Sequence, residues 1–589
     1  MRIYPRGTVL YNKDKAYNGI NLISAAKDGV LLISMCGDEL ARYNLNPMPA
    51  KMLSNGNIIS PTEFRTSDFG VSDGISLVEI NKEGKILWEF SRNKFIKDRG
   101  YKEKWMARVH SDFQRQGHAL DYCHSYKEFY TNKTLMLTHD SVHVSSISDK
   151  ELLDDVILEV DDCGNILWKF SFSEHFDELN FSEEAKNVIY RNPNLRITEN
   201  PIGNYLDLTS ISYLGANKWY DMGDSRFHPD NILFTARAAN IIGIIDRKKN
   251  KIVYTLGPGL DKYSKFSPII GSAFATLIPK GLEGEGNLLI YDNGGSCGYG
   301  PATIFAPKGL FPFVRGYTRI LELNPLTLDI NWMVDPRDFG FSIPLRGYKF
   351  YSPYGGNLER LPNGNTLITL TTEGMALEVT REKELVWLWA SPYRMDTENM
   401  LNNSLVYRVY RYPYNYWGIE DYPEREIKEI NQSYFKLPGA GEFSTAKPIN
   451  VEGAELNKDI DPLSQESESL KELRVSKEIY SRNHHRIKTI SSYDFYEKTK
   501  NLTGIVIFGA IRCTHCGPLI ELMTDLLDEE FPKISCYYLD IDANNSIARN
   551  LEITSIPLVN FYKNGKLVYS FKGENTYDNI ADVIDEYLI

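Results

Sequence analysis

Short runs in which apolar and polar residues alternate recur along most of the chain, and a polar turn joins the two runs of each pair. This pattern is typical of β-hairpins that bury one face. Four pairs are clear and two more are weaker. The clear pairs are Ser76–Phe90, Val156–Phe170, Arg319–Val334 and Ala376–Trp389, and the weaker ones are Leu31–Leu45 and Ile241–Leu256. The pattern therefore predicts six related hairpins.

Several hairpins follow a second turn signal, as in LSNGNII from Leu53 and LPNGNTLI from Leu361. Two hairpins make a four-stranded sheet, which cannot bury both faces alone, but six such sheets packed around an axis leave only short edges. We predict an all-β six-bladed β-propeller. The repeats are long, so the blades are expected to carry long loops, and we expect the loops Arg92–Gln116 and Gly294–Gly316 to build the site.

The pattern changes in the last quarter of the chain. Gly439–Leu473 is rich in Gly, Ser, Glu, Lys and Pro, which predicts a flexible linker. From about Arg486 strands alternate with helices, which predicts an α/β domain. The expected domains are residues 1–438, a linker over 439–473 and the α/β domain over 474–589. Its expected elements are strands Gly504–Gly509, Ile534–Asp540, Leu558–Lys563 and Lys566–Phe571, with helices starting near Cys516 and spanning Asn544–Asn550 and Tyr577–Leu588.

Composition narrows the classes of partner. Hydrophobic residues at 42% and charged residues at 24% are ordinary for a folded globular protein. The net charge of −12 and the absence of a Lys/Arg cluster argue against nucleic acid and anionic lipid as ligands. No apolar run predicts a transmembrane helix or a signal peptide, so we expect no membrane partner and a cytoplasmic location. The oligomeric state is not predicted.

One pair of cysteines is spaced for redox chemistry. Cys513-Thr514-His515-Cys516 follows a buried apolar strand and opens a helix, and no second C-x-x-C completes a zinc site. The free N–H groups of a helix N-terminus and the nearby His515 stabilise a thiolate. We predict that Cys513 is the attacking sulfur and Cys516 the resolving one, with no metal and no cofactor.

The C-terminal segment resembles thioredoxin over about a hundred residues, through CTHCGP from Cys513, SIPLVNFYKNGKLV from Ser555 and a following glycine, Gly573. The resemblance implies that Pro557 is cis and lies against the dithiol. The chain departs from the family at two positions, where Arg512 replaces a tryptophan and Ile507 replaces a buried aspartate. A histidine inside C-x-x-C resembles the more oxidising members. Cys536, in a predicted core strand, is expected to be inert.

Residues 1–420 or so resemble the arylsulfotransferase family. The motifs are YPRGTVLYNKDKAYNG from Tyr4, DFQRQG from Asp112, WYDMGDSRFHPDNILFTARAANIIGIID from Trp219, IPKGLEGEGNLLIYDNGG from Ile278 and RLPNGNTLI from Arg360. The resemblance implies a six-bladed propeller that moves a sulfuryl group between phenols through a sulfated histidine, without a nucleotide cofactor.

The residues that this chemistry needs are missing. Where the family presents histidines, this chain has Ser111, Asp207 and Ala273, and only the arginine is kept, as Arg237. These positions offer a hydroxyl, a carboxylate and a methyl group. None of the three can act near neutral pH both as the base and as the covalent carrier of the sulfuryl group. We predict a ligand-binding channel lined by Arg237, Asp112, Asp207 and Ser111. The alternative is an Arg237–Asp207 pair that only ties two blades together.

Three other features have structural interpretations. His110 and His118 are close to the missing positions, but a lone histidine in such a loop is usually structural. The DMGDSRFH motif from Asp221 is expected to order a loop by hydrogen bonds and not to bind a metal. Cys297 lies in a glycine-rich segment and is expected to be inert.

Three functions follow from these observations. The favoured one is a thiol-disulfide oxidoreductase in which Cys513, Cys516, His515 and Pro557 act, while the propeller binds or selects a small-molecule or protein thiol or disulfide. The second is an aryl sulfotransferase that uses other residues, and the third is a non-catalytic interaction platform.

Overall fold

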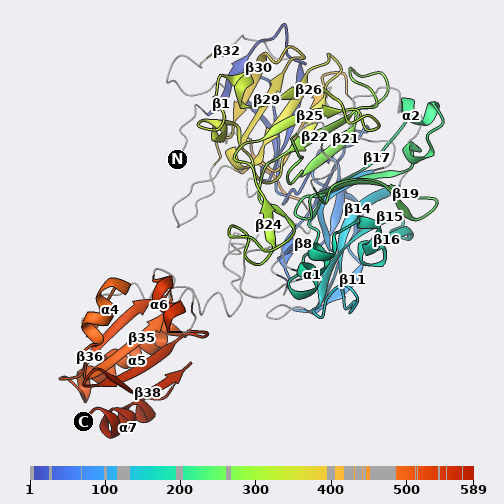
Figure 1. The fold of residues 1–589 in the computed structure, drawn as a ribbon. Coiled ribbons are helices and arrows are strands. Elements are labelled where there is room, and N and C mark those ends of the chain that lie inside the picture. The colour runs from blue at the N-terminus through green and yellow to red at the C-terminus, as the bar shows by residue number, and fades with distance from the viewer. Residues whose placement is uncertain are drawn as a thin grey trace. The chain divides into compact units, whose positions relative to one another are not determined.

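The computed structural model describes residues 6–589 apart from 26–28, 68, 70, 98–101, 116–132, 194–202, 260–266, 394–404, 417–429, 432–440, 442–445, 452–485, 511–512, 514, 542–543, 552 and 574. The chain divides into two compact units, Met1–Leu456 and Asn457–Ile589. Figure 1 shows the first unit as a ring of sheets and the second as one sheet with helices. Each unit is described by itself.

The first unit is a six-bladed propeller, as predicted, and each blade is an antiparallel sheet of four strands. Blade 1 is β31 (Val409–Pro413), β2 (Gly19–Ser24), β3 (Val30–Ile33) and β4 (Glu39–Tyr43); blade 2 is β5 (Lys51–Met52), β6 (Ile58–Pro61), β9 (Leu77–Ile80) and β10 (Ile86–Phe90); blade 3 is β13 (Val109–Arg115), β14 (Thr134–Val142), β15 (Leu152–Val160) and β16 (Ile166–Ser171). Blade 4 is β17 (Leu208–Tyr213), β18 (Ile232–Ala236), β19 (Ile241–Asp246) and β20 (Lys251–Leu256); blade 5 is β21 (Phe274–Leu277), β22 (Leu288–Asp292), β25 (Arg319–Leu323) and β26 (Ile330–Val334); blade 6 is β27 (Leu358–Arg360), β28 (Thr366–Leu370), β29 (Met375–Val379) and β30 (Leu385–Ala390).

The six hairpins expected from the sequence are the last two strands of the six blades, for example β9 with β10 and β15 with β16. The ring closes in blade 1, because β31 from the end of the unit pairs with β2 near its start. The first strands of blades 3 to 6 contact one another in turn. Each pair of neighbouring blades encloses one apolar cluster, so the core consists of six interfaces.

Additional strands extend three blades. A hairpin of β7 (Phe64–Thr66) and β8 (Ser72–Gly74) joins blade 3, β1 (Gly7–Tyr11) and β32 (Ile430–Asn431) join blade 6, and β33 (Pro448–Ile449) pairs with β4 of blade 1. The last pairing corrects the expected linker, because residues 448–449 belong to a blade sheet. Most of that segment, residues 452–485 included, lies outside the described residues.

The two long loops expected to build the site each fold in part as a hairpin. The first contains β11 (Lys94–Ile96) and β12 (Lys104–Met106), and the second contains β23 (Cys297–Tyr299) and β24 (Leu310–Phe313). The helices among the described residues of this unit are short: α1 (Glu183–Arg191) and α2 (Lys218–Asp221), with 3-10 helices at Phe172–Leu179, Ser225–Phe227, Pro336–Phe339, Gly347–Phe350 and Thr371–Glu373.

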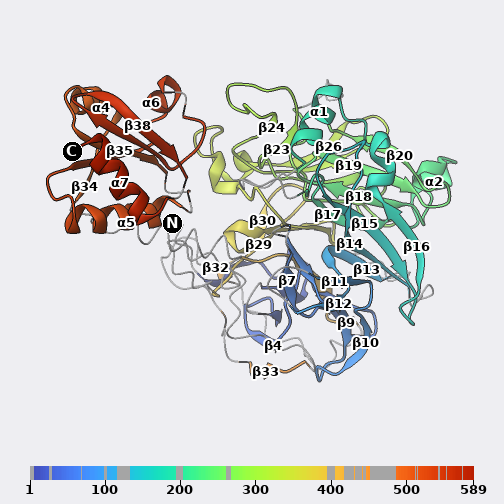
Figure 2. The same ribbon diagram turned by 90° about the horizontal axis from the view of Figure 1, so that it is seen from below.

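The second unit is a five-stranded sheet in the order β34 (Ile487–Thr489), β36 (Ser535–Asp540), β35 (Gly504–Gly509), β37 (Leu558–Lys563) and β38 (Lys566–Lys572). Helices α5 (Cys516–Glu529) and α7 (Tyr577–Tyr587) cover one face, and α4 (Ser492–Thr499) and α6 (Asn545–Asn550) cover the other, as Figure 2 shows. The α/β prediction is confirmed, and its strand and helix limits agree to within one residue. The sequence did not predict β34 or α4.

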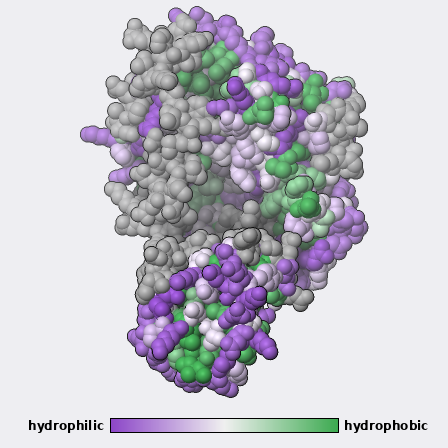
Figure 3. All heavy atoms as spheres, turned by 60° about the vertical axis from the view of Figure 1, so that its left-hand side comes forward, coloured by the Kyte–Doolittle hydropathy of each residue, from purple (hydrophilic) through white to green (hydrophobic). Residues whose placement is uncertain are grey.

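In the part of the chain that the structure describes, no helix has the length and apolar character needed to cross a bilayer. On the face drawn in Figure 3, apolar residues are interspersed with hydrophilic ones. The most exposed large apolar side chains of the described residues are Ile304 and Phe305, in the loop between β23 and β24.

Candidate functional site

The Cys513–Cys516 pair lies between β35 and α5 and forms a disulfide. Helix α5 begins at Cys516, with His515 as its N-cap residue, as the apolar strand and the C-x-x-C spacing predict. The N–H of Cys513 donates to the carbonyl of Ala510 at 3.0 Å, which turns the chain after the strand. Cys516 is fully buried, whereas Cys513 is partly exposed. The exposure therefore favours Cys513 as the sulfur that meets a substrate.

The peptide bond between Ile556 and Pro557 is cis, as the thioredoxin resemblance implies. Pro557 immediately precedes β37, and its carbonyl accepts a hydrogen bond of 2.8 Å from the N–H of Gly573. Ile507 is fully buried in the core that α5 covers, so no carboxylate stands at that position. Arg512 and Thr514 lie outside the described residues. Cys536 is buried, and burial raises the pKa of its thiol, as expected of an inert cysteine.

Asp112, in β13 of blade 3, links its blade to three others and is not part of an open binding surface. Its Oδ1 lies 2.8 Å from Nζ of Lys51 in blade 2 and 2.9 Å from Nη1 of Arg408, next to blade 1. Its Oδ2 accepts from the N–H of Ile211 in blade 4 at 3.1 Å. The carboxylate is 2% exposed. These partners occupy both oxygens, so the structure corrects the prediction that Asp112 contacts a ligand.

Arg237 and Asp207 form a close ion pair, with Nη2 2.7 Å and Nε 3.0 Å from Oδ2. Asp207 precedes β17 and Arg237 follows β18, so both partners of the ion pair belong to blade 4. The guanidinium also donates to the carbonyl of Ser296 and lies 4.7 Å from the ring centroid of Tyr354. Because Asp207 already neutralises Arg237, an anionic ligand has to compete with that carboxylate.

Ser111 lies in β13 beside His110, and its backbone φ of 53° is in the left-handed region. Its Oγ is 3.1 Å from Nδ1 of His110, and its carbonyl accepts from the hydroxyl of Tyr407 at 2.9 Å. Ala273 is buried, and its N–H donates to Asn293. The three positions that lack histidine are thus filled by a partly exposed hydroxyl, the ion-paired Asp207 and a buried methyl group.

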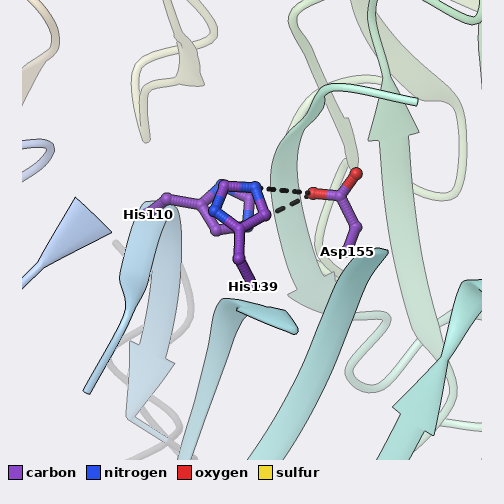
Figure 4. Close-up of side chains that lie close together, drawn as sticks. All are labelled: His110, His139 and Asp155. Carbon is purple, nitrogen blue, oxygen red and sulfur yellow. Dashed lines mark ion pairs between the residues drawn. The ribbon is translucent and has the colours of Figure 1, made fainter. Parts of the chain in front are cut away.

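His110 belongs to a buried cluster that sequence reasoning missed. Figure 4 shows the rings of His110 and His139 stacked on one another, both turned toward Asp155. The ring centroids are 3.6 Å apart and the planes differ by 2°. Oδ1 of Asp155 lies 3.2 Å from Nε2 of His110 and 3.6 Å from Nε2 of His139. These residues come from three adjacent strands of blade 3, and no sequence spacing links them. His118 lies outside the described residues.

The second carboxylate of the cluster is Asp73, on β8. Its Oδ1 is 2.6 Å from Nδ1 of His139, and its Oδ2 accepts from Nε of Arg108 at 2.9 Å. Burial by itself lowers the pKa of His139, but Asp73 and Asp155 outweigh it and raise the pKa to about 9. Burial and the charge of His139 lower the pKa of His110. The stack therefore pairs one cationic ring with one neutral ring.

This cluster does not fit a metal ion as it stands. A ring nitrogen binds a metal along its lone pair, which lies in the ring plane, at about 2.0–2.1 Å for zinc. The two parallel rings share no common plane, and Nδ1 of His139 is held by Asp73. The arrangement is that of a buried charge cluster, in which the hydrogen bonds of Asp73 to His139 and Arg108 tie the β7–β8 hairpin to blade 3.

The raised pKa of His139 makes propeller stability depend on pH. The folded value of about 9 exceeds the usual 6.5, so the stabilisation is complete below pH 6.5 and is lost as pH rises through 9. We expect the free energy of unfolding to fall by about 3 kcal/mol more between pH 6 and pH 10 in the wild type than in His139→Gln. Urea titrations followed by tryptophan fluorescence measure this. His175→Gln, which removes a histidine that contacts neither Asp73 nor Asp155, is the control and should leave the His139-dependent fall in place.

The remaining two interpretations from the sequence are supported. In the DMGDSRFH motif Asp224 accepts from the N–H of Arg226 and pairs with its guanidinium at 2.6 Å, while Asp221 pairs with Lys280 at 2.7 Å. These contacts order a loop. Cys297 is fully buried, and burial raises the pKa of its thiol to about 12, as expected of an inert cysteine.

Comparison with known proteins gives a match for each unit. The arylsulfotransferase (ASST) family model matches residues 72–408, and the thioredoxin family model matches residues 486–586. Thioredoxin from Staphylococcus aureus is 29% identical over 102 residues, which are 17% of this chain and 98% of that protein. Among solved structures, a mutant thioredoxin from Halobacterium salinarum NRC-1 is 17% identical, with 18% of this chain and 96% of that chain covered and a TM-score of 0.17. Thioredoxin from Malassezia sympodialis is 24% identical, with coverage of 18% and 91% and the same TM-score of 0.17.

Proposed function

The chain belongs to the arylsulfotransferase family and carries a C-terminal thioredoxin domain, and from this premise we propose that it is a thiol-disulfide oxidoreductase whose propeller binds or selects the substrate. The observation that carries the proposal is the setting of the dithiol. Cys513 is a partly exposed residue before a helix N-terminus, and its disulfide partner Cys516 is fully buried. This is the arrangement of an attacking and a resolving sulfur.

Sulfuryl transfer by the propeller is not supported by its residues. Of the three positions where the family presents histidine, Ala273 offers no nucleophile and Asp207 is held by Arg237. His110 is buried, with one ring nitrogen near Ser111 and the other near Asp155. A covalent carrier needs a nitrogen that a donor can reach. The family membership therefore gives the propeller its fold, and the chemistry is assigned to the dithiol.

The experiment that tests this function is a mixed-disulfide trap. In the full chain carrying Cys516→Ser, Cys513 attacks a substrate disulfide and no resolving thiolate releases the product. Mass spectrometry of the Cys513 peptide should find a captured thiol, and the double variant Cys513→Ser, Cys516→Ser should capture nothing. An equal amount of captured thiol in the two variants would contradict the proposal.

The same trap tests the role of the propeller. Asp207 is partly exposed in blade 4, where it pairs with the buried Arg237. If the propeller selects the substrate, adding Asp207→Asn to the Cys516→Ser chain should change the amount or identity of what Cys513 captures. If Cys513 captures the same molecules in the same amounts with and without Asp207→Asn, the thioredoxin domain alone selects the substrate.

His515 is expected to make the dithiol more oxidising. It is the N-cap residue of α5, two positions from Cys513. Together with the helix N-terminus it favours the thiolate of Cys513, and a stabilised thiolate raises the reduction potential. Replacing His515 with leucine should lower the potential by roughly 30 mV, a tenfold change in the equilibrium with glutathione. Equilibration in glutathione buffers measures it, and a potential that does not move would contradict the oxidising role.

A further inference from the structure

Tyr538 lies next to the position from which the thioredoxin family's buried aspartate is missing. It is on β36, and the register of the parallel pair places it opposite Ile507 on β35. Its side chain packs in the core that α5 covers and is 3% exposed. Ile507 lies in the same core and has no polar atom in its side chain, so it can neither donate nor accept a hydrogen bond.

The hydroxyl of Tyr538 and the sulfur of Cys516 share one small space above Gly509. A Cβ built on Gly509 would lie 2.8 Å from the Tyr538 hydroxyl oxygen, 2.9 Å from its ring carbon Cε2 and 3.0 Å from Sγ of Cys516. Contacts below 3.0 Å are closer than real Cβ atoms make. Glycine at 509 therefore gives Tyr538 the room to extend toward the resolving sulfur.

On this geometry, and resting on the proposed function, we propose that Tyr538 is a positioning residue whose phenol donates a hydrogen bond to the Cys516 thiolate when the disulfide opens. The phenol acts only as a hydrogen-bond donor and does not transfer its proton to the sulfur. A hydrogen bond to a charged acceptor is worth more than one between neutral groups. Tyr538 thus stabilises the thiolate without acting as the base that the missing carboxylate would supply.

The step in which this contact acts is the first exchange. A substrate thiolate attacks Sγ of Cys513, a bond forms between those two sulfurs, and the Cys513–Cys516 bond breaks. Cys516 leaves with the electron pair as a thiolate and receives the Tyr538 hydrogen bond. The second substrate thiolate then displaces Cys513, so two electrons pass from the substrate dithiol to the protein dithiol. The two protons that the substrate loses pass to water, and the protein dithiol takes up two in its reduced form.

The test measures the reduction potential of the full chain in glutathione buffers from pH 6 to pH 11, with the Cys513–Cys516 peptide read by differential alkylation and mass spectrometry. The reduction potential falls as the pH rises, and the plot of potential against pH becomes less steep at the pKa of each sulfur of the reduced dithiol. Each such change of slope is called a break. In Tyr538→Phe we expect the higher break, that of Cys516, to move up by about one pH unit. The variant leaves the titratable side chains of Cys513, His515, Cys536 and Asp540 in place.

Two further variants make the result specific. Tyr537→Phe removes a hydroxyl from the next residue of β36, whose side chain lies on the opposite face of the sheet, and should leave both breaks in place. Gly509→Ala puts a methyl group between the hydroxyl and the sulfur and should shift the higher break in the same direction as Tyr538→Phe. Gly509→Ala also tests the proposal if the Tyr538→Phe variant does not fold.

The outcomes separate the inference from the function on which it rests. A higher break that stays in place in Tyr538→Phe and Gly509→Ala, while the dithiol still exchanges with glutathione, would overturn the role of Tyr538 alone. An equal shift in Tyr537→Phe would also overturn it. A wild-type chain that does not exchange with glutathione at all would contradict the proposed function, and the inference with it.

Discussion

Replacing Cys513 with serine should reduce disulfide exchange by more than about 10³-fold, to the rate of the buffer. The thiolate is the nucleophile in this chemistry, and a serine hydroxyl is not ionised near neutral pH. Cys516, the other sulfur of the pair, is fully buried and does not replace it. The measurement is the reduction of insulin disulfides by dithiothreitol in the presence of the full chain, followed as turbidity.

Two comparisons complete this prediction. Cys516→Ser should also lose turnover, and in the absence of dithiothreitol it should accumulate the mixed disulfide, because the first attack survives. Cys536→Ser should keep the wild-type rate, since burial raises the pKa of that thiol and keeps it from reacting. Residual turnover in Cys513→Ser at a tenth of the wild-type rate or more would mean that another group carries the reaction.

The second large effect concerns the propeller. Asp112→Ala should lower its free energy of unfolding by roughly 3–5 kcal/mol, because the substitution leaves the cations of Lys51 and Arg408 buried without their carboxylate. The two cations have exposed side-chain fractions of 12% and 2%. The neighbouring Ile211 N–H loses its acceptor as well. All eight tryptophans lie at or before residue 417, so tryptophan fluorescence in urea reports on this unit and not on the thioredoxin domain.

The matched control is Asp221→Ala. Asp221 also forms an ion pair, with Lys280 at 2.7 Å, but both side chains are about half exposed. Water replaces such a contact at little cost, so the urea midpoint should not change measurably. If both variants unfold at the same urea concentration, Asp112 is not the joint between blades 2, 1 and 4 that its contacts describe.

The sequence predicted the fold because its signals are local and repeated. An alternating run such as Val156–Phe170 predicts a hairpin wherever it occurs. Six such hairpins in one chain predict six sheets that bury their faces by packing around an axis as a closed ring. The dithiol was predictable for the same reason, since strand, C-x-x-C and helix are consecutive from Gly504 to Glu529. The cis bond before Pro557 followed from a resemblance carried by a short motif.

The sequence alone thus determined the six hairpins, the α/β unit and the redox pair, each from residues that are neighbours in the chain. The tertiary structure decided what the polar residues of the propeller do. Asp112 was expected to meet a ligand, but cations from Lys51 and Arg408, 61 and 296 positions away, occupy it. His110 stacks on His139 from another strand, and the Tyr538 hydroxyl and the Cys516 sulfur both lie beside Gly509. Contacts of this kind depend on which strands the folded sheets bring together, and a local sequence pattern does not predict them.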